Sequence, residues 1–211
     1  MCKTSSKHLY NEHANVCLIL TNAFSIYVCA FPPAMPTIYV VFKKAVESHV
    51  ESVVQWFAGP MIHVDIVPGN HALSFTSYMF ETFSVNPRTT YSPDTHTCLA
   101  IDVTQAEHDG AYDMLTRFVQ KELQYNYNDV LRSVLPGPVI SSDVKSDDEI
   151  SSLYCSQAVT LVLRTCVTEN KELGAALCAL NSRFTTPNML YEAIRPHAEE
   201  SVALHEVRQP A

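Results

Sequence analysis

Hydrophobic residues in this chain recur with two periods, one typical of strands and the other of helices. Residues 38–42, 61–67 and 98–103 are rich in β-branched residues, and residues 73–85 add aromatic residues and threonine. Such stretches favour strands. Residues 45–57 carry apolar residues at helical spacing instead. We therefore predict four strands over the first four ranges and a helix over the last.

Helical patterns dominate the second half of the chain. Thr104 is suited to cap a helix that reaches about Leu123, because Glu107 follows at the spacing of a capping box. Further helices are predicted over residues 153–167, with Ser151 or Ser152 as the cap, over residues 169–180, and from Pro187 onward, with a polar surface loop over residues 141–149. Together these elements indicate an α+β fold: a small, mostly antiparallel sheet with helices packed against it.

One domain, from residue 35 to residue 197, accounts for these elements, and residues 198–211 form a polar tail. Residues 1–34 precede the domain as an N-terminal extension. Within the extension, residues 14–31 are apolar but slightly short for a membrane span and interrupted by polar residues. Three interpretations stay open for the extension: short strands, a disordered segment, or a weak membrane anchor.

Composition narrows the class of protein. Of the 211 residues, 47% are hydrophobic and 17% charged, as in a folded globular chain. The net charge of −8 argues against a general nucleic-acid binder, because phosphate contact needs a basic surface. The same charge gives no support for binding to an anionic membrane surface, so any membrane association would depend on residues 14–31.

The cysteines point to a reducing environment. There are seven, an odd number, and none are spaced Cys-x-x-Cys. This suits an intracellular, cytoplasmic protein better than a secreted disulfide framework. No compact cluster of cysteine and histidine has ligand spacing, so we expect neither a metal site nor a cofactor.

Cys155 is the candidate nucleophile. It closely follows Ser151 and Ser152 and so falls in the first turn of the predicted helix. Free backbone N–H groups and the helix dipole stabilise a thiolate there. Cys166 and Cys178 lie inside apolar helical stripes, which is typical of buried structural cysteines.

His63 is the candidate base. Strand alternation puts it on the same face as Asp65, opposite the neighbouring isoleucines and valine. A third polar group must orient the imidazole. Strand register decides which one: a tight hairpin at residues 69–70 would bring Thr76 opposite His63, and a longer connection would bring Glu81 there. We favour Glu81.

The ordered set of His63, Glu81 and Cys155 resembles the circularly permuted branch of the NlpC/P60 papain-like superfamily. The matching segments span residues 36–196: GPMIHVDIVPG, MFETF, YNYNDVL, LYCSQAVTLVLR and TTPNMLYEAI. That branch includes bacterial amidase-like proteins, lecithin–retinol acyltransferase-like proteins and proteins of large DNA viruses. Its pattern is a histidine in an early strand, a polar residue in the next strand, and a cysteine that opens a later helix.

The resemblance implies a papain-like thiol hydrolase of the amidase or peptidase type. Such an enzyme would cleave a peptide, isopeptide or ester through a thioester, with Cys155 as nucleophile, His63 as base and Glu81 orienting the base. The acyltransferase-like members carry Asn-Cys-Glu-His around their cysteine, where this chain has Tyr-Cys-Ser-Gln; this departure argues against lipid acyl transfer. The alternative is a catalytically silent binding or structural protein that retains the fold.

Overall fold

The computed structural model describes residues 8–11, 16–20, 26–30, 35–44, 52, 55, 59–69, 73–77, 81–87, 91–134 and 150–204. The chain divides into two compact units, residues 1–35 and 36–211. The first unit contains a three-stranded antiparallel sheet of β1 (His8–Asn11), β2 (Val16–Leu20) and β3 (Ile26–Ala30). The second unit contains the candidate site residues His63, Thr76, Glu81 and Cys155.

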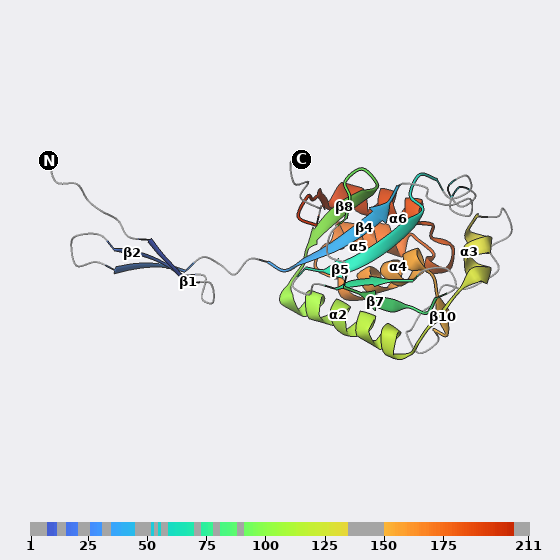
Figure 1. Cartoon of the computed structure of the whole chain (residues 1–211), viewed down its shortest axis with the longest axis horizontal. Coiled ribbons are helices and arrows are strands. Elements are labelled where there is room, and N and C mark those ends of the chain that lie inside the picture. The colour runs from blue at the N-terminus through green and yellow to red at the C-terminus, as the bar shows by residue number, and fades with distance from the viewer. Residues whose placement is uncertain are drawn as a thin grey trace, which may run out of the picture. The chain divides into compact units, whose positions relative to one another are not determined.

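The second unit is built on a six-stranded sheet with the order β11-β8-β4-β5-β6-β7, and all of its pairings are antiparallel. Figure 1 shows its long strands β4, β5 and β8 side by side. The strands are β4 (Thr37–Lys43), β5 (His63–Pro68), β6 (Ser74–Thr76), β7 (Ser84–Asn86), β8 (His96–Asp102) and β11 (Glu199–Glu200).

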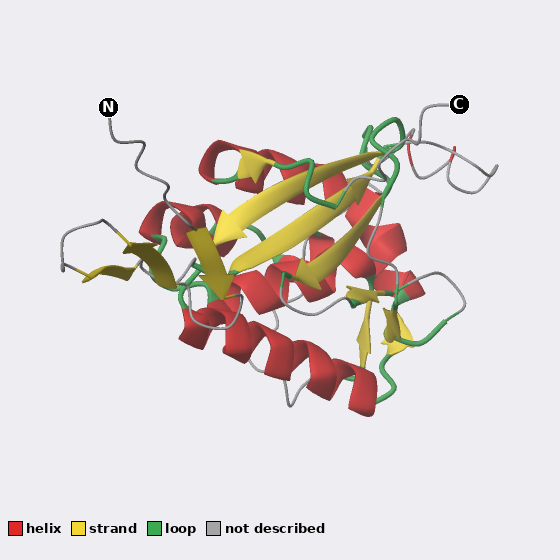
Figure 2. Cartoon of the chain, turned by 60° about the vertical axis from the view of Figure 1, so that its left-hand side comes forward, coloured by secondary structure: helices red, strands yellow, loops and turns green. Residues whose placement is uncertain are grey.

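Helices pack against this sheet, as Figure 2 shows in red and yellow. They are α2 (Gln105–Gln120), α3 (Tyr127–Val134), α4 (Cys155–Cys166), α5 (Lys171–Cys178) and α6 (Pro187–Ile194), with short 3-10 turns η2 (Ser182–Phe184) and η3 (Arg195–His197). A parallel pair, β9 (Gln124–Tyr125) and β10 (Ser152–Leu153), lies outside the main sheet. The predicted α+β class, with a mostly antiparallel sheet and packed helices, is confirmed.

The two faces of the sheet contribute to separate hydrophobic clusters. Ile38, Val40 and Phe42 of β4 join the main core, which also contains residues of α2, α4, α5 and α6. Val41, between them in sequence, joins a smaller cluster with Tyr91 and other residues. Burying one side chain of this size stabilises the fold by about 1.5–3 kcal/mol. Because successive side chains of a strand point to opposite faces, the apolar positions fix which face of each strand is buried against the helices.

Glu107 ties two helical segments together. The predicted capping box is present: the Thr104 hydroxyl accepts from the Glu107 N–H, and the Glu107 carboxylate accepts from the Thr104 N–H at 2.8 Å. Its other oxygen accepts from the N–H groups of Thr168 at 2.6 Å and Glu169 at 2.7 Å. One buried carboxylate therefore fixes both the start of α2 and the connection from α4 to α5.

Two local predictions were wrong. Residues 73–85 form no single strand: β6 and β7 pair with each other, Phe75 opposite Val85, so the chain folds back between them. The helix predicted from residue 153 begins at Cys155, with Tyr154 rather than a serine as N-cap, because Ser152 and Leu153 pair with β9 instead.

Some predictions are not tested. Residues 141–149 and nearly all of residues 45–57 lie outside the described residues. Across the described part of the chain, no helix combines the length and hydrophobicity that crossing a bilayer requires.

We expect Glu107→Gln to lower the free energy of unfolding at pH 7 by about 1–3 kcal/mol, because a neutral amide cannot accept all of these hydrogen bonds. Urea denaturation measures the change. Asp113→Asn, an exposed substitution on the same helix, is the control and should cost less than about 0.5 kcal/mol.

The loss should also depend on pH. Burial raises the pKa of Glu107, but the backbone N–H groups of Glu169, Thr104 and Thr168 more than offset this, so the pKa lies below its ordinary value. A lowered carboxyl pKa contributes stability above the unfolded value, and that contribution is lost as the pH falls through the folded value. The difference between wild type and Glu107→Gln should therefore shrink in acid. A difference that stays constant down to pH 2 would contradict this account.

Candidate active site

His63 is the first residue of β5, where the strand begins beside Lys43 of β4. Its side chain is 12% exposed. The predicted alternation is present: Val64 and Ile66 join the main core, and Asp65 is the next residue on the His63 face. An imidazole held at the end of a paired strand has little freedom to move, which suits a group that must meet a partner at a fixed position.

Asp65 and Thr76 hold the imidazole. The Nε2 atom of His63 lies 2.9 Å from Oδ1 of Asp65 and 2.8 Å from Oγ1 of Thr76. Strand register explains the arrangement. Ile66 pairs with Phe75, so continuing the ladder by one residue sets Thr76 opposite Asp65, on the same face of the sheet. The side chain of His63, two residues before Asp65, reaches both.

Cys155 is the first residue of α4 and is 5% exposed. Its neighbours anchor the start of the helix. The Tyr154 hydroxyl lies 3.2 Å from the carbonyl oxygens of Ser182 and Thr185, and the Ser156 hydroxyl donates to the Thr185 carbonyl at 2.6 Å. The thiol therefore has a well-defined position between two anchored residues.

The thiol of Cys155 and the imidazole of His63 interact. Burial lowers the pKa of His63, but the negative charges of Cys155 and Asp65, followed by hydrogen bonds that the imidazole donates to each, raise it to about 10. Nε2 of His63 faces Asp65 and Thr76. An imidazole with so high a pKa holds a proton at neutral pH beside a sulfur that can carry negative charge.

Asp65 remains ionised. Burial raises its pKa, but the charge of His63 and hydrogen bonds from His63, Thr76 and Tyr91 lower it below its ordinary value. A carboxylate buried to this degree is stable only when it is paired and hydrogen-bonded. Its placement meets the requirement for a group that orients the imidazole.

The structure brings together two of the three predicted site residues. Cys155 and His63 meet, but Glu81 is exposed and lies in the connection between β6 and β7, outside the strand that was expected to carry it. Asp65 and Thr76 take the orienting position instead. Thr76 was the alternative. The signal for Asp65 was in the sequence, since it is a carboxylate within an apolar strand and shares a face with His63.

Tyr125 lies near enough to Cys155 to be affected by its charge. It pairs with Leu153, two residues before Cys155. Its ring packs at a tilt against Tyr127, with centroids 5.0 Å apart. Burial, and after it the charges of Cys155 and Tyr127, raise the pKa of the Tyr125 hydroxyl well above its ordinary value, so this group keeps its proton at physiological pH and can donate it in a hydrogen bond.

The surroundings of Cys155 differ from those of the other buried cysteine among the described residues. Cys98 belongs to the smaller cluster on the sheet, and burial raises the pKa of its thiol to about 12. No histidine or carboxylate is among the causes of that shift. Cys98 is therefore an internal reference for an unactivated thiol.

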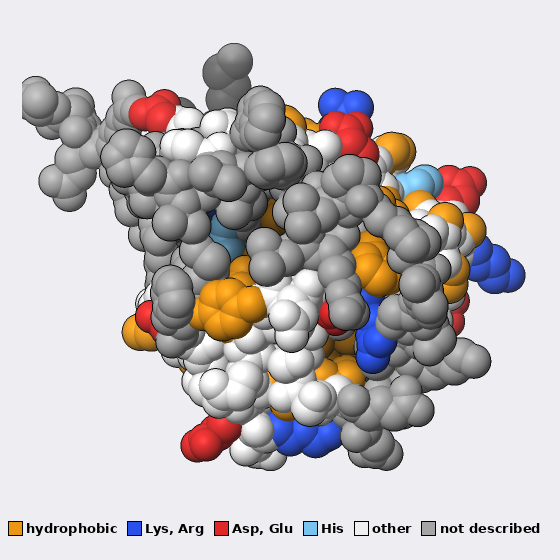
Figure 3. Space-filling view, turned by 90° about the vertical axis from the view of Figure 1, so that its right-hand side faces the viewer, with side chains coloured by type: hydrophobic (Ala, Val, Ile, Leu, Met, Phe, Trp, Pro, Cys, Tyr) orange, Lys and Arg blue, Asp and Glu red, His pale blue; other side chains and the backbone are white. Residues whose placement is uncertain are grey.

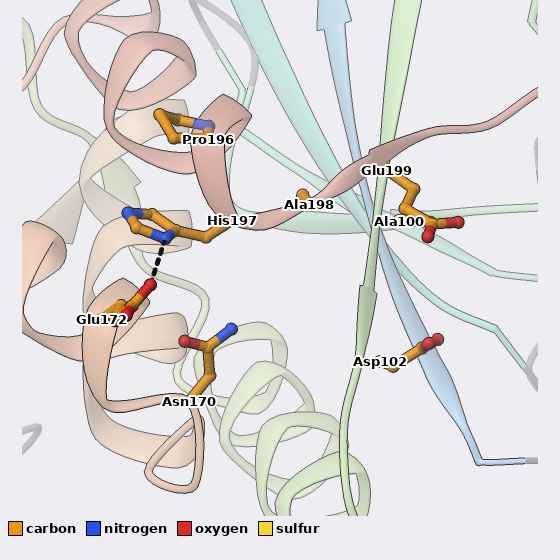
Figure 4. Close-up of a pocket in the computed structure, with 8 residues that line it drawn as sticks. All are labelled: Ala100, Asp102, Asn170, Glu172, Pro196, His197, Ala198 and Glu199. Carbon is orange, nitrogen blue, oxygen red and sulfur yellow. Dashed lines mark ion pairs between the residues drawn. The ribbon is translucent and has the colours of Figure 1, made fainter.

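A pocket among the described residues is separate from the Cys155 group (Figure 4). Three of its lining residues are acidic, and Nδ1 of His197 lies 3.8 Å from Oε2 of Glu172 within it. None of its lining residues carries a thiol or a hydroxyl: Ala100, Asp102, Asn170, Glu172, Pro196, His197, Ala198 and Glu199. Figure 3 views the side that carries α3 and β10, where hydrophobic side chains (orange) and histidine (pale blue) are both visible.

In comparisons with known proteins, no family model matched the chain, and neither a curated protein nor a solved structure matched it. What can be inferred about function therefore rests on the residues of the site and their geometry.

Removing the thiol should change the titration of its partner. Cys155→Ala removes the charge that contributes most to raising the pKa of His63, so that pKa should fall from about 10. Asp65 still raises it, which should limit the fall. Nuclear magnetic resonance of ¹⁵N-labelled histidine measures it. Cys98→Ala is the control and should leave the His63 titration unchanged. An unchanged His63 pKa in Cys155→Ala would show that the two groups are not coupled.

Asp65 and Glu81 can be compared directly as orienting groups. Asp65→Asn keeps the shape of the side chain but removes its charge, so we expect iodoacetamide to alkylate Cys155 at least tenfold more slowly at pH 7. Glu81→Gln removes a charge from an exposed position and should leave the rate within twofold of wild type. Peptide mapping by mass spectrometry assigns each alkylated cysteine. Equal effects of the two substitutions would contradict the assignment of Asp65.

Proposed function

We propose that this protein is a cysteine hydrolase that cleaves an amide, isopeptide or ester bond through a thioester intermediate. The observation that carries the proposal is the group of three side chains: a thiol beside an imidazole, and the imidazole held by a buried carboxylate. Thiol hydrolases of unrelated folds share this arrangement, in which the nucleophile contacts the base and the base contacts an orienting group.

We further propose a permuted papain-like arrangement. The histidine comes from an early strand and the cysteine from the start of a later helix, the reverse of the order in papain-like enzymes that are not permuted. Support comes from the position of His63 at the beginning of β5 and of Cys155 at the beginning of α4. Cys98, Cys155, Cys166 and Cys178 are not in disulfides, which fits the reducing, intracellular compartment expected from the sequence.

The first half of the reaction would form the thioester. The Cys155 thiolate attacks the carbonyl carbon, a C–S bond forms, and the carbonyl oxygen becomes an oxyanion. When the tetrahedral intermediate collapses, the bond to the leaving group breaks, and His63 gives the leaving nitrogen or oxygen its proton. His63 then removes a proton from water, which attacks the thioester and releases the acid and the free thiol.

Two donors are candidates for the oxyanion. The N–H of Cys155 is one, because the first N–H groups of a helix have no partner within the helix. The hydroxyl of Tyr125 is the other, because it remains protonated and lies close enough to sense the charge of Cys155. Each such donor is worth about 3 kcal/mol of transition-state stabilisation.

Acylation by p-nitrophenyl acetate tests the proposal. We expect a burst of nitrophenolate and an acetyl adduct that peptide mapping assigns to Cys155. Cys155→Ala should abolish the adduct. His63→Gln should slow acylation by about 10²-fold or more, because it removes the base, whereas Cys98→Ala, at the unactivated thiol, should leave the rate unchanged.

Two results would contradict the proposal. One is that Cys155 reacts no faster than Cys98 with iodoacetamide at neutral pH; the other is that His63→Gln leaves the rate of Cys155 unchanged. Either would favour a binding or structural protein that keeps the arrangement without turnover.

A further inference from the structure

Behind the candidate triad, the structure continues a chain of buried hydroxyl groups. The Tyr91 hydroxyl lies 3.1 Å from Oδ2 of Asp65 and 2.9 Å from Oγ of Ser74. All three side chains are buried: Tyr91 is 0% exposed, Ser74 1% and Asp65 4%. Sequence reasoning gave no reason to connect Tyr91 with His63, 28 residues earlier in the chain.

The two oxygens of Asp65 have different partners. Oδ1 faces His63, and Oδ2 faces the Tyr91 hydroxyl. A carboxylate rotates about one bond, so a donor fixed on one oxygen also fixes the direction of the other. We propose that Tyr91 is a positioning residue of the candidate active site, whose hydroxyl holds the Asp65 carboxylate in the rotation that orients His63.

The proton inventory supports this role. A phenol carries one proton, and the carboxylate is a stronger acceptor than the serine hydroxyl. The Tyr91 hydroxyl therefore donates its hydrogen bond to Asp65. The Ser74 hydroxyl can then donate to the phenol oxygen. Ser74 and Thr76 lie on the same face of β6, so this strand supplies one hydroxyl to Tyr91 and another to His63.

Tyr91 is itself held in place at both ends. Its N–H donates to the carbonyl oxygen of Leu204 at 2.8 Å, and its ring packs with Val41, Val67 and Cys98 in the smaller cluster. Its ring also lies at a tilt to His96, with centroids 5.1 Å apart. A hydroxyl on so constrained a ring has few alternative positions, which a positioning group requires.

This role presupposes the proposed thiol chemistry, and alkylation of Cys155 by iodoacetamide tests it without requiring turnover. Tyr91→Phe keeps the ring and removes the hydroxyl. We expect about tenfold slower alkylation at pH 7, as for the loss of a hydrogen bond to a charged group. Tyr39→Phe, in a tyrosine packed against the same cluster, is the matched control and should leave the rate within twofold.

A double-mutant cycle separates positioning from a general structural effect. If Tyr91 acts through Asp65, Tyr91→Phe should have no further effect on alkylation in the Asp65→Asn background. The ¹⁵N shifts of the His63 ring in Tyr91→Phe should also move toward those in Asp65→Asn. Ser74→Ala, a milder change that leaves Tyr91 in place, should shift the rate and the His63 signals in the same direction by less.

The outcomes are distinct. Additive effects of Tyr91→Phe and Asp65→Asn, or a Tyr91→Phe rate equal to wild type, would overturn the positioning role. If Tyr91→Phe failed to fold, Ser74→Ala would decide, and unchanged His63 signals in that variant would overturn the role. Rapid, Asp65-dependent alkylation without hydrolysis of any ester would instead contradict the proposed function and leave the positioning role standing.

Discussion

The arrangement at the candidate site depends on one buried charge. The carboxylate of Asp65 lies almost out of contact with water, and its neighbours satisfy it: His63 on one oxygen and Tyr91 on the other. Without these partners the charge would be too costly to bury. Together with Cys155, the charge of Asp65 raises the pKa of His63, and the contact between Asp65 and Nε2 fixes the position of the imidazole. The stability of this part of the fold and its proposed chemistry therefore have a common cause.

The sheet makes this arrangement possible because it brings distant segments into one register. β5 supplies His63 and Asp65, and β6 supplies Ser74 and Thr76 on the same face. Helix α4 supplies Cys155 from much further along the chain, and the Tyr91 hydroxyl contacts the second oxygen of Asp65. No one of these segments would indicate a site by itself.

Much of the fold was predictable because it depends on local patterns. The capping box at Thr104, the alternation around His63 and the strand that became β8 all follow from periodicity and local hydrogen bonding. The residues that we propose as nucleophile and base could be singled out for a similar reason, since a thiol at the beginning of a helix and a histidine in an apolar strand both depart from ordinary composition.

The contact of Thr76 with the imidazole, and the absence of Glu81 from it, were not predictable, because they depend on register. Residues 73–85 have strand-forming composition throughout and contain no strong turn signal, so the hairpin between β6 and β7 left no local mark. That hairpin removes Glu81 from the sheet. The register of β6 on β5 lies between the two that were considered, and it brings Thr76 opposite Asp65 rather than opposite His63. Tyr91 depends on tertiary packing alone.

The central claim is that Cys155 and His63 form a working pair, and an experimental structure at about 2 Å resolution tests it most directly. The account predicts that Sγ of Cys155 lies within about 3 to 4 Å of a ring nitrogen of His63, a range that allows for loose geometry in the free protein, with Nε2 of His63 on Asp65. A thiol that faces only aliphatic side chains, with His63 turned away from it, would contradict the account.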